Sequence, residues 1–426
     1  MKYVAVVVMF ALAGVAALLP APEAAEHEPS PVTELPPIST CPLVVGSGRS
    51  TEIGILSSVN GEGRVSSFSS GEATSSLEFR TGASGSVTLD AAETGAVGSA
   101  GGLIEMPTAT TATGVLTVGE SARSAESCAD IATGQAFLSG GTTASGATFD
   151  LQLLNPYAGE ATLELTVTTD AGIEANERFD AIRVPPLSSV TLPMSQIIPG
   201  REEISVDIEV VSGSALAVGR QTIDGRTALW RAVEPAQDWW LPIPEGGATK
   251  QLLIATPTNS EVEYQIDYYG PDGFQEAFES GVLAPRGRQR VGLAAISEET
   301  AGLRVITTGP VVPTLWVNSP NSLALTTGSP VDASAWLLPG AHSPPGGGGT
   351  AVILNSGIED VSVDVITLQE SSLSRGFVIP ADGVIEVDLV DANGYRIEAS
   401  GPVVVLWTSQ FGGDGTTAIG IPIQDG

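Results

Sequence analysis

Basic residues are scarce in this chain, and their scarcity sets its electrostatic character. Lysine and arginine total 18 against 49 aspartates and glutamates, which gives a formal net charge of −31. The acidic residues are about as frequent as in ordinary proteins, so the imbalance reflects missing cations rather than surplus carboxylates. Such a surface repels nucleic acid and anionic lipid headgroups. We therefore expect no nucleic-acid partner, and membrane contact only through the N-terminal segment.

Residues that carry catalysis or hold metals are also scarce. Only two histidines occur, His27 and His342, and neither lies beside a sequence typical of a nucleophile turn. Histidine and cysteine form no metal-ligand pattern, and no glycine-rich loop precedes a helix as phosphate binding requires. Aspartates beside glycine or alanine, such as Asp272 and Asp382, are interpreted as turn residues rather than calcium ligands. The sequence thus predicts no catalytic residue, no cofactor and no metal site.

The chain has only two cysteines, Cys41 and Cys128. Both fall in the first of the repeats described below, one near its start and one near its end. Their placement in a chain expected to be exported predicts a disulfide, with two buried free thiols as the alternative. Closing a loop of this length would stabilise the fold by ~4 kcal/mol in the chain-entropy model.

The N-terminus combines one basic residue with an uncharged apolar run. Lys2 precedes a run from Tyr3 to Leu19 that Pro20 ends. This pattern predicts that residues 1–25 are a signal peptide or a membrane anchor, and both alternatives stay open. The Pro- and Glu-rich segment 26–37 is predicted to be a tether. In either case the rest of the chain is expected outside the cytoplasm, secreted or anchored.

Long helical patterns are absent after this segment. Short motifs typical of β-strands and turns recur instead, and we call them landmarks. Three landmarks recur with a period of about 100 residues, which fits a small domain rather than a solenoid unit. The first is Trp240-Leu241-Pro242 with Trp336-Leu337-Leu338-Pro339; the second is Leu153-Leu154-Asn155-Pro156 with Ile353-Leu354-Asn355-Ser356; the third is Gly309-Pro310-Val311-Val312 with Gly401-Pro402-Val403-Val404.

The landmarks divide the chain into four β-repeats with alternating apolar and polar residues between turn signals. We predict an all-β chain of about four immunoglobulin-like sandwiches, with a single β-propeller-like assembly of four repeats as the alternative. Short linkers between the repeats further predict an extended rod. The predicted repeats span residues 38–134, 135–237, 238–333 and 334–426.

The chain resembles a known family in the order of four features: an aromatic–Leu–Pro motif, a Gly-rich turn, Leu-x-Asn-Pro and an alternating strand. It resembles tandem repeats in actinobacterial exported proteins that are classed only as a domain of unknown function. The resemblance covers about 38–426 and is best at 151–168 and 228–241. Asn155-Pro156 keeps the motif, whereas Asn355-Ser356 and Thr256-Pro257 depart from it. The resemblance implies an envelope-associated location and transfers no catalytic residue.

Aromatic residues make up only 5% of the chain, and the tryptophans recur at matched positions. Such recurrence favours core or inter-repeat packing over a binding platform. Trp239 is expected to be the exception, because adjacent strand residues face opposite sides. Trp316 and Trp407 are near-equivalent on the strand after Gly-Pro-Val-Val, where the second repeat has Arg220. These four residues are the predicted candidates for an interaction surface.

The expected function is therefore non-catalytic. We predict a structural or adhesive scaffold of the cell envelope whose partner is an envelope protein or a wall glycan. A carbohydrate-binding array or an accessory module of cell-wall processing is the alternative. A hydrolase stays a weaker one, because many carboxylates are present but nothing singles out a catalytic pair.

Overall fold

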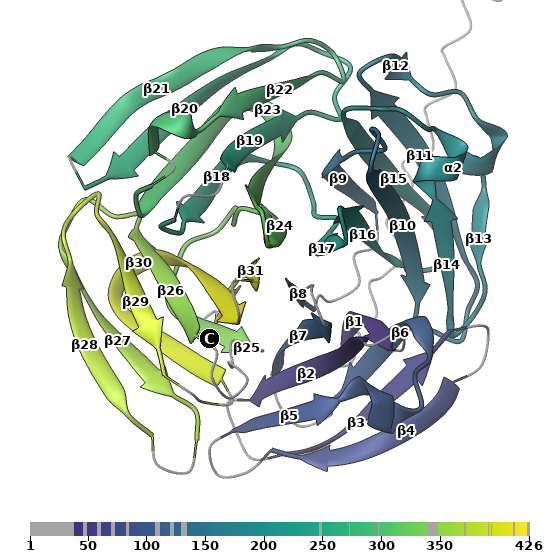
Figure 1. Cartoon of the computed structure of the whole chain (residues 1–426), viewed down its shortest axis with the longest axis horizontal. Helices are drawn as coiled ribbons and strands as arrows, with labels where there is room; N and C mark the ends of the chain where they lie inside the picture. Colours follow the sequence, from purple (N-terminus) through teal and green to yellow (C-terminus); the bar gives the residue numbers. More distant parts are fainter. Residues whose placement is uncertain are drawn as a thin grey trace, which may run out of the picture. The chain divides into compact units, whose positions relative to one another are not determined.

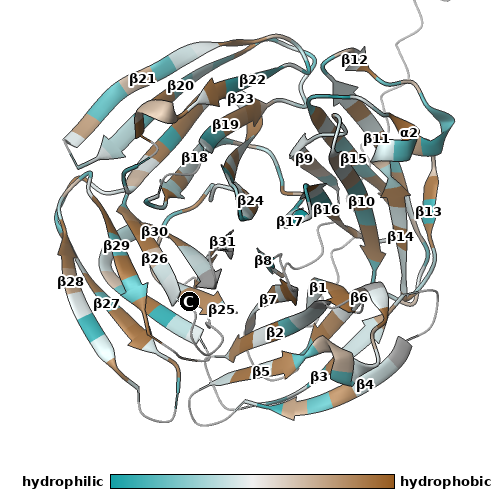
Figure 2. Ribbon diagram, viewed as in Figure 1, coloured by the Kyte–Doolittle hydropathy of each residue, from teal (hydrophilic) through white to brown (hydrophobic). Residues whose placement is uncertain are grey.

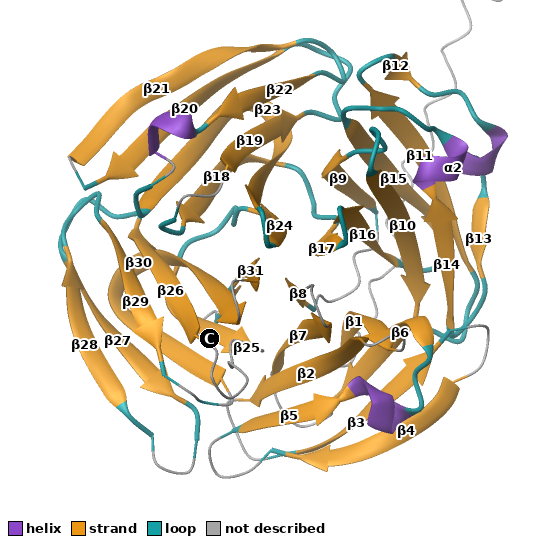
Figure 3. Cartoon of the chain, in the orientation of Figure 1, coloured by secondary structure: helices purple, strands orange, loops and turns teal. Residues whose placement is uncertain are grey.

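Short alternating strands and frequent turn residues make this chain fold into antiparallel sheets. Strand β11 (Ala161–Thr169) is an example, with Leu163 and Val167 fully buried and Glu164 exposed between them. Residues of one strand point alternately to the two faces of a sheet, so this pattern places one face on a core. The chain is all-β apart from short helical segments (Figure 3).

The computed structural model describes residues 38–423 except for loop positions 46–48, 58–60, 70–72, 82–84, 107–110, 120–122, 129–133, 247–248, 272, 297, 340–347, 370–371, 391, 393 and 412–413. The predicted signal or anchor segment 1–25, the tether 26–37 and both histidines lie outside the described residues. Within the described residues, no helix has the length and apolar character needed to cross a bilayer.

Repeat 1 consists of two four-stranded antiparallel sheets with strand orders β1-β6-β3-β4 and β5-β2-β7-β8. Their inner faces share a core that includes Leu43, Ile53 and Ile104. The elements are β1 (Ile38–Val45), β2 (Arg49–Ser57), β3 (Glu62–Phe68), β4 (Ala73–Arg80), β5 (Ser86–Asp90), η1 (Ala91–Thr94), β6 (Gly98–Glu105), β7 (Thr111–Gly119) and β8 (Arg123–Ser127).

Repeat 2 has the same plan, with strand orders β12-β11-β15-β9 and β14-β10-β16-β17, and β13 pairs with β11. Its core includes Phe149 and Trp230, whose rings stack 5.5 Å apart. The elements besides β11 are β9 (Gln135–Gly141), β10 (Ala147–Asn155), β12 (Gly172–Ile173), η2 (Glu177–Phe179), β13 (Ile182–Val184), β14 (Ser188–Pro193), α2 (Met194–Ile197), β15 (Ile204–Ser212), β16 (Leu216–Ile223) and β17 (Arg226–Arg231).

In repeats 3 and 4 one long strand runs through both sheets: β23 (Ala301–Ser319) and β30 (Gly394–Phe411). The other elements of repeat 3 are β18 (Ala236–Ile243), β19 (Thr249–Ala255), β20 (Val262–Gly270), β21 (Gly273–Leu283), β22 (Arg288–Gly292), η3 (Ala294–Ile296) and β24 (Ser322–Thr327). Those of repeat 4 are β25 (Ala333–Pro339), β26 (Gly348–Asn355), β27 (Val361–Thr367), β28 (Ser374–Ile379), β29 (Val384–Leu389), β31 (Asp414–Ile419) and β32 (Ile421–Pro422).

The four repeats close into a ring (Figure 1). Four strands near the C-terminal ends of the repeats, namely β8, β17, β24 and β31, each contact the corresponding strands of both neighbouring repeats. We call these four the axial strands. In each repeat the strands paired around the axial strand are the axial sheet, and the remaining strands are the companion sheet; in repeats 3 and 4 the long strand joins the two. Residues 37–426 accordingly form one compact unit.

Hydrogen bonds cross all four junctions of this ring. They are Arg231 N to Glu126 Oε2 (2.9 Å), Arg226 Nη1 to Asn318 Oδ1 (2.6 Å), Ser322 Oγ to the Gly415 carbonyl (2.6 Å) and Ala125 N to Thr416 Oγ1 (2.9 Å). The last of these joins repeat 1 to repeat 4. The expected extended rod is therefore wrong, because short linkers turn the chain around a centre instead of along a line. Closure is a feature of the propeller-like alternative, but a propeller blade is one four-stranded sheet, whereas repeats 1 and 2 supply two sheets each and repeats 3 and 4 supply sheets of seven and eight strands.

The second landmark lies at the junctions between repeats. Leu354 of repeat 4 packs on Gly302 of repeat 3, and Leu56 of repeat 1 packs on Gly394 of repeat 4. A Cβ atom on Gly302 would lie 2.6 Å from Leu354 Cδ1, and one on Gly394 would lie 2.5 Å from Leu56 Cδ2. Glycine is therefore required for the close approach of the neighbouring leucine. The recurring leucine thus joins one repeat to the preceding one.

The asparagine of the same landmark holds its own repeat together. Asn155 is completely buried; its Nδ2 donates to the carbonyls of Gly159 (2.7 Å) and Val184 (3.0 Å), and its Oδ1 accepts from Tyr157 N. Asn355 is equally buried and makes the equivalent bonds in repeat 4. The side chain therefore satisfies backbone groups of a turn and of a neighbouring strand, which explains why the residue recurs.

Replacing Asn155 with alanine should destabilise the fold by about 3 kcal/mol, because two buried carbonyls and one N–H would lose their partner. Urea denaturation of the full chain measures this loss. Asn321→Ala is the matched control, since Asn321 is exposed in the turn between β23 and β24. Equal denaturation midpoints for the two variants would contradict the structural role of Asn155.

The structure joins Cys41 of β1 to Cys128, the residue after axial strand β8, by a disulfide. The bond connects the first companion sheet to the centre of the ring. Replacing both cysteines with alanine should lower the free energy of unfolding by about 2–5 kcal/mol, mainly through the unfolded chain. Unchanged thermal unfolding of this double variant relative to the wild type would show that the crosslink carries no stability.

Candidate functional site

The densest group of cations in the chain lies between repeats 2 and 3. Arg286, Arg288 and Arg290 occur within five residues of a protein that has 18 basic residues in all. Arg288 and Arg290 belong to β22 and face Glu203, the residue before β15 in the preceding repeat, while Arg286 faces Asp207 within β15. We call these five residues the arginine cluster.

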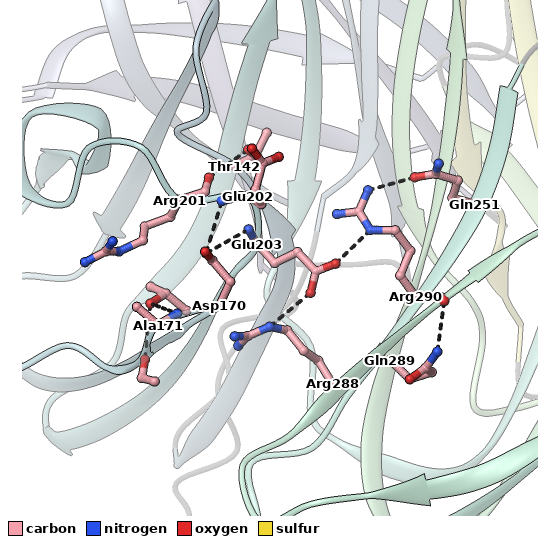
Figure 4. Close-up of polar contacts among 12 residues, drawn as sticks. Thr142, Asp170, Ala171, Arg201, Glu202, Glu203, Gln251, Arg288, Gln289 and Arg290 are labelled. Atoms are coloured by element: carbon pink, nitrogen blue, oxygen red, sulfur yellow. Dashed lines mark hydrogen bonds and ion pairs between the residues drawn. The ribbon is translucent and has the colours of Figure 1, made fainter.

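A single carboxylate lies at the centre of the arginine cluster (Figure 4). Glu203 Oε1 lies 2.8 Å from Arg290 Nε, and Glu203 Oε2 lies 3.0 Å from Arg288 Nε. Asp170 orients this carboxylate from repeat 2, because its Oδ1 accepts hydrogen bonds from the backbone N–H groups of Glu202 (3.1 Å) and Glu203 (3.4 Å). Arg286 Nη1 makes a separate ion pair with Asp207 Oδ2 at 3.2 Å. Two repeats are thus connected by three ion pairs.

Partial burial strengthens these ion pairs. The Arg288 side chain is 13% exposed and that of Glu203 is 18% exposed. Burial lowers the pKa of Arg288, while the negative charges of Glu203 and Asp170 raise it. Arginine nevertheless stays protonated in proteins, so the pair stays charged. Because water screens such a pair less than one on the surface, the cluster contributes to closure of the ring.

The environment of Arg290 links the arginine cluster to the landmark tryptophans. Its Nη1 donates to Gln251 Oε1 at 2.7 Å, and its guanidinium lies 5.9 Å from the centre of the Trp316 ring. The ion pairs of the cluster neutralise charge at the junction between repeats 2 and 3.

A second group of charges lines a groove on repeat 1. The groove has a volume of about 540 Å³. Its lining residues are Glu62, Gly63, Arg64, Glu78, Phe79, Arg80 and Glu105. Arg64 pairs with Glu105 at 2.5 Å and Arg80 pairs with Glu62. The Arg80–Glu62 pair is largely exposed and the Arg64–Glu105 pair is partly exposed. Such pairs add little stability, but they present donors and acceptors at the surface.

The structure corrects the expected position of Trp239. Its ring is completely buried, and its Nε1 donates to the carbonyls of Ala236 (3.1 Å) and Val311 (2.9 Å). Trp336 in repeat 4 is also completely buried and donates to Ala333 and Val403 at the same distances. Trp239, and not Trp240, is therefore the counterpart of Trp336. Of the adjacent pair, Trp239 faces the core, which contradicts the exposed position expected for it.

The other three predicted surface residues are also enclosed or paired. Trp407 is completely buried in the core of repeat 4, and Trp316 is 7% exposed and packs among residues of repeat 2. Arg220 Nη2 bonds Asp150 Oδ2 at 2.6 Å, directly across the strand pair. The structure therefore brings none of these residues together at an open surface, and it uses them for packing and pairing within the ring.

The arginine cluster was not predicted from the sequence, although a signal for it exists. The run Arg286-Gly287-Arg288-Gln289-Arg290 is an unusual local concentration of cations in a cation-poor chain. Its partners Glu203 and Asp207 lie about 80 residues earlier, and only the ring brings them close. Among the described residues, no three His, Cys, Asp or Glu side chains are grouped so as to hold a metal ion.

Comparison with known families identifies the chain. The model of a family of unknown function, DUF5719, matches residues 81–319, which is more than half of the sequence, and the chain belongs to this family. The match begins inside repeat 1 and ends with β23 of repeat 3, so it spans the junction that contains the arginine cluster. No curated protein matches the chain.

Glu203→Gln should destabilise the fold by about 2 kcal/mol, because Arg288 and Arg290 would keep their charges without a carboxylate between them. The loss should shrink in high salt, which screens the unpaired cations. Glu62→Gln is the matched control, since its ion pair with Arg80 is exposed and should contribute little. Denaturation at low and high ionic strength compares the two, and equal losses would contradict a role for burial.

Proposed function

We propose that this member of the DUF5719 family is a non-catalytic scaffold of the cell envelope. It acts outside the cytoplasm, secreted or held by its N-terminal segment, and it presents a surface to an envelope protein or a wall glycan. We further propose that each repeat is an immunoglobulin-like sandwich, since two antiparallel sheets enclose one core in repeats 1 and 2, and in repeats 3 and 4 the strands joined by the long strand enclose a core of their own. The disulfide favours an oxidising compartment.

One observation carries this proposal: the recurring residues serve the construction of the ring. Leu354 and Leu56 pack on glycines of the preceding repeats, Asn155 and Asn355 satisfy buried backbone groups, and Trp336 packs in a core. An enzyme is expected to keep at least one constellation of polar residues with free reactive atoms. What recurs in this chain is a rigid frame, which suits a protein that presents surfaces.

The outer edges of repeats 3 and 4 offer exposed apolar side chains for such a surface. Val282 on β21 is 60% exposed, and Val378 on β28 is 64% exposed. Both strands are at the ends of their sheets, and Figure 2 shows hydrophobic and hydrophilic residues mixed along them. Edge strands can pair with another chain, so these two are the first candidates for contact with a partner protein.

A capture experiment with the full chain tests the scaffold proposal. Cross-linking to an intact envelope fraction should recover one defined partner, and the double variant Val282→Ser/Val378→Ser should recover roughly tenfold less of it. Val97→Ser is the matched control, because Val97 is 78% exposed but lies in repeat 1. Release of soluble fragments from wall material by the purified chain, or an absence of any bound envelope component, would overturn the proposal.

A carbohydrate-binding role is a second candidate, favoured by the groove on repeat 1. Partly exposed Arg–Glu pairs such as Arg64–Glu105 present adjacent donors and acceptors, which match the hydroxyl groups of a sugar. Calorimetric titration with wall glycans should then show binding that Arg64→Ala and Glu105→Ala both abolish. Binding that survives these changes would place any sugar site elsewhere.

A further inference from the structure

One axial strand carries an ionisable residue at a position where the other three do not. The strand pairs align Glu126 with Val115, Trp230 with Gly219, Thr326 with Leu315, and Ala418 with Trp407. In each repeat, the strand that pairs with the axial strand also pairs with the strand of the second landmark, which is β2, β10, β19 or β26. The register of these pairs shows that the four positions are equivalent. Repeat 1 therefore has a glutamate where the other repeats have tryptophan, threonine or alanine.

The carboxylate of Glu126 lies at the junction with repeat 2. The residue is 7% exposed; its Oε2 accepts from the backbone N–H of Arg231 at 2.9 Å, and its Oε1 accepts from Ser127 N at 2.8 Å. The first of these bonds connects axial strand β8 to axial strand β17. Burying the carboxylate costs free energy that a neutral carboxyl group would not cost, and the two backbone contacts offset part of this cost.

Few charged groups face Glu126 from the elements packed around it. Strand β17 carries Arg231 at its end and Arg226 at its start, and β7, β24 and the described side chains of β31 carry no titratable group. On β8 itself, Arg123 Nη1 donates to Ser409 Oγ of β30 in repeat 4 at 3.2 Å. Arg231 is therefore the main compensating charge, and its buried Nε has no hydrogen-bond partner among the described residues.

We propose that Glu126 makes the junction between repeats 1 and 2 sensitive to pH, with the protonated carboxyl closing the ring more tightly than the carboxylate does. The proposal does not depend on what the ring binds.

The direction of the effect follows from the balance of forces on the carboxyl group. Burial raises the pKa of Glu126 to about 7, against the charge of Arg231 and the two backbone hydrogen bonds, which lower it. The folded state then holds this proton more tightly than the unfolded chain, where the pKa is about 4.5. The stabilisation is complete below the lower pKa and is lost as the pH rises to about 7, above which it changes no further.

Denaturation of the full chain at pH 5 and pH 8 tests the proposal by comparing the wild type with Glu126→Gln. The ratio of their unfolding constants should change at least tenfold between the two pH values, since each unit of pKa difference corresponds to a factor of ten. Glu164→Gln, at an exposed position of β11, is the control and should track the wild type.

Two further measurements keep the test decisive. Glu126→Thr introduces the residue that repeat 3 has at this position, and it should remove the same pH dependence if Glu126→Gln does not fold. Hydrogen exchange should show the protection factor of the Arg231 amide falling from pH 5 to pH 8 in the wild type and not in either variant. Parallel pH profiles for wild type and variants would overturn the proposal.

Discussion

Burial of both faces of each axial sheet is the constraint on which the rest of this structure depends. One face packs on the companion sheet of the same repeat, and the other packs on the preceding repeat. Leu116 and Ala125 of repeat 1 accordingly join the core of repeat 4, and Leu323 and Leu325 of repeat 3 join that of repeat 2. A sheet buried on both sides needs apolar residues on both faces, and this requirement is met only when the ring closes.

Closure also explains where the polar residues of the interior lie. Charges placed between repeats are costly unless they are paired, and the arginine cluster meets this condition with Glu203 between two guanidinium groups. Glu126 meets it only in part, because its partners are backbone N–H groups. The two junctions therefore differ in kind. The junction between repeats 1 and 2 contains a buried acid that can take up a proton, whereas the junction between repeats 2 and 3 contains a compensated ion network.

Some features followed from the sequence because they rest on local patterns. The all-β class follows from the alternation seen in Leu163–Val167, and a bond between Cys41 and Cys128 follows from the absence of any other cysteine. The structural use of the tryptophans was also expected in outline. The alignment of the tryptophans between repeats was not expected. Trp239 matches Trp336, and Trp407 aligns with Gly219 and Leu315 rather than with Arg220. A shift of one residue exchanges the two faces of a strand, and sequence similarity alone does not fix it.

The strands, their turns and the recurring residues could be predicted from local patterns, because they depend on period-two alternation and on residues such as Asn155. The ring in place of a rod, and the contacts of Arg288 and Arg290 with Glu203, became visible only in the folded chain. Both outcomes depend on contacts between residues far apart in the chain, such as Ala125 with Thr416. Local sequence patterns carry no information about such distant pairs, because these contacts form only when the repeats pack on one another.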